Sequence, residues 1–204
     1  MMKLRSVIPV FSISLLMLGA CSSDDAVPSA KSVGSDGPMV HVSPHGWAEP
    51  VQVGQTISDG LEVLYLENVP SDATAVITNV SLIGDDALEL VDAYIVPGPR
   101  KVGSFILPDQ WPPVEGSRLT PVLDPAIGAS IGTRSASDDW GWLLVIGMRS
   151  VQPGYKVRSG IRIDYEYLGT EYFVNVPGVV GMCVSSKPLK EGAECAIPKI
   201  GEVQ

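Results

Sequence analysis

The stretch "GIRIDYEYLGTEYFVNV", residues 160–176, decides the fold class of this chain. Apolar and aromatic side chains alternate with charged ones before Gly169, and the alternation resumes after Thr170. Alternation of this kind puts every second side chain on one face of a β-strand, and a Gly between two such runs is typical of a tight turn. The stretch therefore predicts a β-hairpin with its turn at Gly169. The side chains expected on one face are Ile161, Ile163, Tyr165, Tyr167, Tyr172, Val174 and Val176.

Other strand-like runs lie on both sides of the hairpin, separated by turn-forming residues. The run 140–148 is continuously apolar, which is typical of a strand buried on both faces. In the run 74–83 we expect Val76, Val80 and Leu82 to share one face. The predicted strands outside the hairpin are 60–69, 74–83, 87–96, 101–107, 140–148 and 179–184.

Seven or eight short strands with frequent turns predict an all-β fold, an antiparallel β-sandwich of immunoglobulin-like architecture. The Cys…Trp…Cys pattern of true immunoglobulin domains is missing, so the similarity is one of architecture only. Architecture does not fix function. The sequence therefore predicts how the chain folds more clearly than what it does.

The first residues have the pattern of an export signal. Lys3 and Arg5 precede an apolar run over 7–18, which is shorter than the roughly 20 residues that span a bilayer. The run ends in residues that resemble the lipobox of bacterial lipoproteins, namely Leu18, Gly19, Ala20 and Cys21. This resemblance implies cleavage before Cys21 and attachment of fatty-acyl chains such as palmitate to its sulfur.

The residues after Cys21 are rich in Ser, Asp, Gly and Pro and offer little to bury, which predicts a solvated tether. The expected organisation is a signal peptide over 1–20, the lipidated Cys and tether over 21–46, and one β-sandwich domain over 47–204. The mature chain resembles uncharacterised lipoproteins of Gram-positive bacteria whose single domain ends in a Tyr-rich hairpin and a Cys. We expect it on the extracytoplasmic face of the cell membrane, or at the outer membrane where a cell has two.

The chain is acidic, with a formal net charge of −9 that becomes −11 once residues 1–20 and their two basic side chains are removed. Nucleic-acid binding needs a basic surface, so we expect no nucleic-acid partner. A negative chain is not attracted to anionic lipid either. The expected membrane contact is therefore the lipid on Cys21.

If Cys21 carries lipid, an even pair of cysteines remains, Cys183 and Cys195. Exported proteins meet an oxidising environment, so we expect these two to form a disulfide. Two free thiols or half of a metal site are the alternatives.

The histidines of the chain, His41 and His45, lie close to Met39. Imidazole and thioether groups bind copper, so an envelope copper-binding protein that uses these three residues is an alternative function. Pro44 prevents a helix that would put both rings on one face. A solvated linker is therefore the favoured interpretation, and no cofactor or metal is expected.

Two groups of aromatic residues are candidate contacts. Trp111 lies in a proline-rich connection, where an exposed ring would contact an envelope protein or polymer; packing on the open end of the sandwich is the alternative. Asp138 and Asp139 precede Trp140 and Trp142, a combination that can bind a sugar or a cation. Aromatic residues on a buried strand usually pack in the core, and we favour that role.

The sequence contains no clear catalytic set. A Ser-His-Asp triad needs a His, and both histidines fall in the predicted tether. The two remaining cysteines are expected to be oxidised and therefore unable to act as nucleophiles. We expect a lipid-anchored extracytoplasmic binding or structural module of the cell envelope, not an enzyme. An enzyme that acts on envelope polymers is the further alternative.

Overall fold

A computed structural model describes residues 37–42, 45–96, 105–107, 111, 123–134 and 141–195 of the chain. The predictions on the signal peptide, Cys21 and most of the tether lie outside these residues, as do those on Asp138, Asp139 and Trp140. Within the described part, no helix has the length and apolar character needed to cross a membrane.

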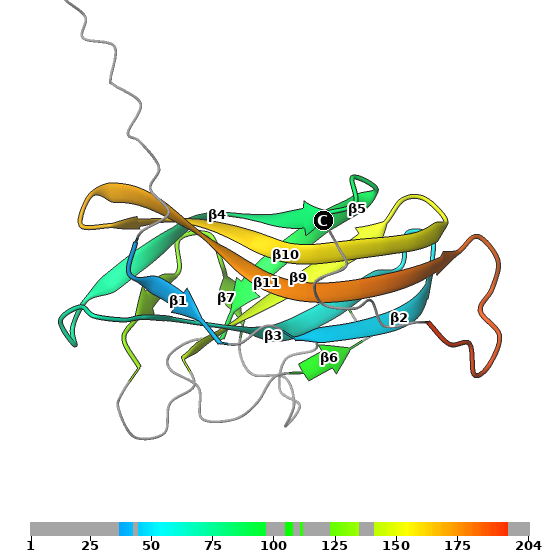
Figure 1. The fold of residues 1–204 in the computed structure, drawn as a ribbon, viewed down its shortest axis with the longest axis horizontal. Helices are drawn as coiled ribbons and strands as arrows, with labels where there is room; N and C mark the ends of the chain where they lie inside the picture. Colours follow the sequence, from blue (N-terminus) through cyan, green and yellow to red (C-terminus); the bar gives the residue numbers. More distant parts are fainter. Residues whose placement is uncertain are drawn as a thin grey trace, which may run out of the picture. The chain divides into compact units, whose positions relative to one another are not determined.

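The described strands form two sheets that lie face to face (Figure 1), which confirms the all-β class and the β-sandwich. Sheet I contains, in spatial order, β1 (Met39–His41), β3 (Thr56–Leu66), β9 (Trp142–Ser150), β5 (Leu88–Ile95) and β7 (Asp124–Pro125), with β6 (Phe105–Leu107) also paired to β3. Sheet II contains β2 (Gly46–Gln52), β11 (Thr170–Ser185), β10 (Gly154–Tyr167), β4 (Thr74–Gly84) and β8 (Ser130–Gly132). Neighbouring strands are antiparallel except β2, which runs parallel to β11.

The predicted hairpin is confirmed as β10 and β11. Ile163 lies opposite Val174, and the two-residue turn at Leu168 and Gly169 has positive φ angles of 51° and 74°. Two consecutive positive φ angles are the conformation of a type I′ turn, whose twist matches that of the flanking strands. The inward face of β10 is fully buried at Ile161, Ile163 and Tyr165, as the alternation predicts.

The predicted break before a separate strand 179–184 is wrong, because β11 continues through Pro177 and Gly178 to Ser185. Proline cannot donate a ladder hydrogen bond and is tolerated in sheets at irregular positions. Pro177 lies opposite Gly160, where the register between β10 and β11 shifts. Beyond this point β2 adds to β11, starting with Gly46 opposite Val179.

The main core lies between the two sheets and takes apolar side chains from both. A second, smaller cluster on β3 and β9 involves Val63, Leu143 and Val145, with Trp111 packed against it. Strand β9 is therefore buried on both faces from Leu143 to Met148, as its continuous apolar run predicts.

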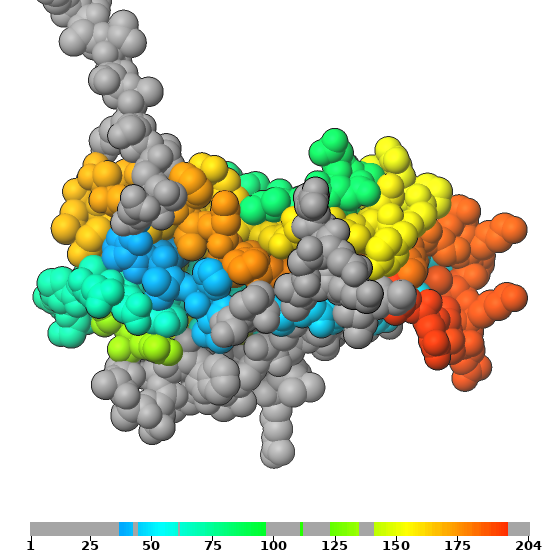
Figure 2. Space-filling view, in the orientation of Figure 1, coloured from blue at the N-terminus to red at the C-terminus, as the bar shows by residue number. Residues whose placement is uncertain are grey.

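The predicted boundary between the tether (21–46) and the domain (47–204) is wrong, because β1 and the start of β2 lie before residue 47. Met39 is 3% exposed within the main core, and its backbone N–H donates to the Tyr165 hydroxyl at 3.1 Å. A strand of three residues has too little alternation to be recognised in sequence. In the space-filling view the β1–β2 segment, in blue, lies against β11, in orange (Figure 2).

Candidate functional site

Two carboxylates, Asp59 and Glu62, point into the core from the middle of β3. Side chains three residues apart on a regular strand face opposite ways. The pairing of β3 with β9 shifts register between Asp59 and Glu62, so one extra residue is accommodated and both carboxylates face inward. Their exposed fractions are 0% and 1%.

Arg158 reaches the same place from the opposite sheet. Its Nη2 atom forms ion pairs with Asp59 Oδ2 and Glu62 Oε1, both at 2.8 Å, and the side chain is fully buried. Strand β10 also shifts register immediately after Arg158, opposite both β4 and β11. The guanidinium thus ties sheet II to sheet I through two charged contacts inside the core.

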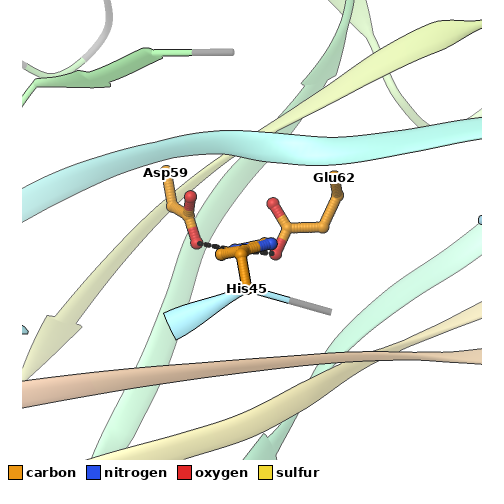
Figure 3. Close-up of side chains that lie close together, drawn as sticks. All are labelled: His45, Asp59 and Glu62. Atoms are coloured by element: carbon orange, nitrogen blue, oxygen red, sulfur yellow. Dashed lines mark ion pairs between the residues drawn. The ribbon is translucent and has the colours of Figure 1, made fainter. Parts of the chain in front are cut away.

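His45 completes the group at the point where the chain leaves β1 in sheet I and enters β2 in sheet II. Its Nε2 atom lies 3.6 Å from Glu62 Oε1 and 3.9 Å from Asp59 Oδ2, between the two carboxylates (Figure 3). The imidazole is 23% exposed, which makes it the only one of the four side chains with appreciable contact with solvent. The prediction that His45 belongs to a solvated linker is wrong. We call His45, Asp59, Glu62 and Arg158 the ion cluster.

Gly178 on β11 forms one wall of the ion cluster. A Cβ atom at this position would lie 3.1 Å from Arg158 Nη2 and 3.1 Å from His45 Cε1. Any side chain here would press on both groups. The absence of a side chain at Gly178 therefore lets the His45 imidazole and the Arg158 guanidinium both lie next to the two carboxylates.

The surroundings separate the pKa values of the two carboxyl groups. Burial by itself raises the pKa of Asp59, but the attraction of Arg158 and the contribution of His45 outweigh it and hold that pKa below its ordinary value. Burial and the nearby negative charge of Asp59 raise the pKa of Glu62 to about 7, against the attraction of Arg158 and His45. Two carboxylates that share one counter-charge behave in this way, because they cannot both ionise freely. Burial lowers the pKa of Arg158, but Glu62 and Asp59 raise it further, so the guanidinium stays charged.

The ligand atoms of His45, Asp59 and Glu62 lie within 4.8 Å of one another, as those of a metal site would. The two oxygens that face His45, however, already contact Arg158 Nη2 at 2.8 Å. A divalent cation bound to these oxygens would lie next to a buried positive charge, and repulsion between like charges is strong where water is excluded. Arg158 therefore provides the cation of this site, and the arrangement favours a structural ion cluster over a metal centre.

Asp59, Glu62 and Arg158 are not among the site residues predicted from the sequence. One signal was available, since Gly60 lies between the two acids, at the first position of the predicted strand 60–69. A lone Gly within a strand often marks a bulge, and a bulge would have put both acids on one face. No sequence signal indicates that Arg158, almost a hundred residues further on, meets them.

The copper ligands proposed from sequence take separate places. The Met39 side chain lies in the apolar core. His41 Nδ1 lies 2.8 Å from the backbone oxygen of Val42, and His45 belongs to the ion cluster. The side chains of the three residues therefore lie in three different environments.

Trp111 is half-buried. The predicted partner contact required an exposed ring, and the structure does not show one. Its ring lies 5.6 Å from that of Tyr94, and a Cβ atom added to Gly147 would collide with it. The indole covers the outer face of β9, which favours a packing role. The ring packs on the face of the sheet, not at the open end of the sandwich. Trp142 packs against the main core, in the role expected for an aromatic residue on this strand.

The predicted disulfide is confirmed. Cys183 on β11 is bonded to Cys195, with their Cα atoms 5.6 Å apart. The bond clips the segment after β11 back onto its own strand.

A shallow hollow of about 420 Å³ lies near β7 and β8, lined mainly by apolar groups and by Asp124. Trp142 forms part of its wall, together with Ile95 and Ile127. This hollow has one carboxylate and no neighbouring His or Cys among its lining residues, so it offers a contact surface and no catalytic set.

Comparisons with known proteins give little further information. No family model matches the chain, and no curated protein is similar to it. Among solved structures it is similar to a non-cellulosomal cohesin from the hyperthermophilic archaeon Archaeoglobus fulgidus, with 10% sequence identity and a TM-score of 0.26. The match covers 72% of this chain and 91% of that chain. A likeness at this level carries no argument about function.

Proposed function

We propose that this chain is a lipid-anchored, non-enzymatic binding or structural module that acts on the extracytoplasmic side of a cell membrane. The lipid is attached to Cys21, and the β-sandwich contacts another protein or a polymer of the cell envelope. The observation that carries the proposal is the Cys183–Cys195 disulfide, because structural disulfides persist in oxidising, exported environments. It agrees with the export signal predicted from the first 20 residues and with the resemblance of residues 18–21 to a lipobox.

The burial and the ion pairs of the ion cluster support a role without catalysis. General acid–base catalysis needs a titrating group that reaches a substrate. Asp59, Glu62 and Arg158 are at most 1% exposed, and the guanidinium already engages both carboxylates. Of the four residues, only the imidazole of His45 has appreciable exposure.

The anchor is tested by metabolic labelling of the producing cells with an alkyne fatty acid. We expect label on the wild-type chain and none on Cys21→Ala, which should be released from the membrane fraction. The double variant Cys183→Ala/Cys195→Ala is the matched control, since it removes two cysteines and should remain labelled. Label that persists on Cys21→Ala would overturn the proposed anchor.

The binding role is tested by chemical cross-linking in intact cells, followed by purification of the full chain in detergent. We expect a defined cross-linked protein or polymer species that is lost when the anchor is removed by Cys21→Ala. Cross-linking that yields only the free chain, together with turnover of isolated envelope polymer by the purified protein, would favour an enzyme instead.

A further inference from the structure

The tip of the β10–β11 hairpin, by which we mean residues 166–171, exposes a large apolar side chain. Leu168 is 84% exposed, more than any other large hydrophobic residue in the described part of the chain. The nearest aromatic residues, Tyr167 and Tyr172, pack against the main core. The core therefore ends before the turn, and the Leu168 side chain contributes little to it. A single exposed Leu is common on protein surfaces, so exposure alone does not indicate a binding site.

The backbone at Leu168 adds a second local cost. Its φ angle is 51°, in the left-handed region, and Gly169 follows with 74°. Contact between Cβ and the neighbouring backbone disfavours this region for residues other than Gly, and Asn or Asp tolerates it better than Leu. The first central position of a type I′ turn is accordingly filled most often by Asn, Asp or Gly. Neither backbone preference nor burial explains a Leu at this place.

A pair of like charges lies directly beside the turn. Glu166 on β10 is opposite Glu171 on β11, and the Cβ atoms of such partners are about 5 Å apart. Like charges at this separation destabilise a hairpin. Among the described residues, no ion pair engages either carboxylate. The repulsion between the two acids is therefore not compensated within this part of the chain.

We propose that the hairpin tip docks into another protein, whose surface has an apolar pocket bordered by Lys or Arg side chains. Leu168 enters the pocket, and Glu166 and Glu171 form ion pairs with its border. Docking removes the Leu168 side chain from water and gives both acids a positive partner, so two of the three local costs are relieved in the complex. The tight turn between two long strands presents the side chain in a fixed place, which keeps the entropic cost of docking small. This inference rests on the proposed binding role and names its surface and its partner.

The two acids decide which occupant fits the tip. A surface of anionic lipid would repel Glu166 and Glu171, and so would the phosphates of a nucleic acid. A second copy of this chain offers the hollow near β7 and β8 as an apolar acceptor. Asp124 is the charged residue among those that line this hollow, so its border would repel the tip as well. A protein with a basic border is the occupant that complements both the Leu and the acids.

Site-specific photo-cross-linking in the producing cells tests the docking. A photoreactive amino acid replaces Thr170, an exposed residue of the tip, in the full chain, while Leu168 and both acids stay in place. We expect a discrete adduct with a protein. The same photoreactive residue at Val151, which is 45% exposed in the turn before β10, is the control and should not give this adduct. The absence of a protein adduct at position 170, or an adduct with lipid in its place, would overturn the proposal.

Charge reversal in the chain with the photoreactive residue at position 170 tests the role of the acids. Glu166→Lys/Glu171→Lys keeps the repulsion within the hairpin but puts like charges against the partner. We expect the adduct yield to fall roughly tenfold or more. Glu191→Lys/Glu194→Lys is the matched control, because it changes the net charge equally at two exposed residues outside the tip. It should keep the yield of the unchanged chain, and an equal loss in both variants would contradict the assignment to the tip.

Leu168→Asn separates a contact residue from a structural one. Asn tolerates the positive φ angle and removes the apolar side chain, so we expect the melting temperature to rise by about 2–4 °C. The adduct yield should fall roughly tenfold, because the pocket loses the side chain that fills it. A lower melting temperature or an unchanged yield would overturn the proposal. If the tip gives no adduct while chemical cross-linking of the wild-type chain still yields a partner, the docking surface is refuted and the binding role stands.

Discussion

At Gly178, the absence of a side chain makes room for two neighbouring side chains of the ion cluster. The imidazole of His45 and the guanidinium of Arg158 would each lie 3.1 Å from a Cβ atom there, closer than ordinary van der Waals contact. We predict that Gly178→Ala lowers the free energy of unfolding by about 1–3 kcal/mol, the usual effect of overpacking a dense interior. Asn175→Ala, an exposed change on the same strand, should stay within about 0.5 kcal/mol of wild type. Urea unfolding at pH 6 measures both, and equal stability of the two variants would argue against the crowded geometry.

Glu62 links stability to pH in a direction opposite to that of most acids. Its pKa of about 7 in the folded chain exceeds the ordinary value of 4.5, so between these values the folded state holds a proton that the unfolded state has released. Its stabilising contribution is therefore complete below pH 4.5 and is lost as the pH rises through 7. Asp59, whose pKa is lowered, contributes in the opposite sense and loses its effect as the pH falls below its ordinary value of 3.8.

We predict that the wild-type chain loses about 3 kcal/mol more stability between pH 4.5 and pH 8 than Glu62→Gln does. The physical reason is that the amide cannot ionise, so the unbalanced buried charge never forms. Thermal and denaturant unfolding of both chains across this range provide the comparison. Parallel pH profiles would mean that Glu62 ionises in the folded chain as it does in water.

The ion cluster could not be predicted from the sequence, and the reason differs among its residues. His45 lies in a segment whose composition is that of a tether, and Pro44 beside it discourages any regular element. Asp59 lies just before the predicted strand 60–69, and strict alternation would put it and Glu62 on opposite faces of the sheet. Arg158 meets them only because the two sheets are packed face to face, which no local pattern encodes.

At the scale of the strands, alternation predicts well where the register is regular. The hairpin arms are regular from Ile161 to Asp164, and their faces are as expected. In β4 the pairing with β10 shifts register between Asn79 and Ile77, which turns Val76 outward. Val76 is 39% exposed while Ile77 is fully buried, so the expected shared face of Val76 and Val80 is wrong. A one-residue bulge reverses every face assignment beyond it.

Strand β1 is short but firmly part of the domain, and a substitution can test this. We predict that Met39→Ala lowers the free energy of unfolding by about 2–5 kcal/mol, because it opens a cavity in the main core. Val53→Ala, at a residue that is 39% exposed, should change stability by less than about 1 kcal/mol. If Met39→Ala is as stable as Val53→Ala, residues 39–41 behave as the tether that the sequence indicated.

At the scale of the whole molecule, the two sheets are held by an apolar core and by the ion cluster, while the disulfide acts at one strand end. The bond closes a short loop between residues 183 and 195. We predict that Cys183→Ala/Cys195→Ala lowers stability by about 2–4 kcal/mol, mainly through greater freedom of the unfolded chain. Its stability should keep the wild-type dependence on pH, because neither cysteine belongs to the ion cluster. A change in that dependence would show that the clip and the cluster are coupled.

Arg158 balances one of the two buried carboxylates and leaves the other, Glu62, holding a proton near neutral pH. Carbon-13 NMR of glutamate side-chain carboxyl groups in the full chain tests it most directly, with the Glu62 signal assigned by its loss in Glu62→Gln. We predict that this signal titrates with a midpoint near pH 7. A midpoint near 4.5, the ordinary value for glutamate, would contradict it.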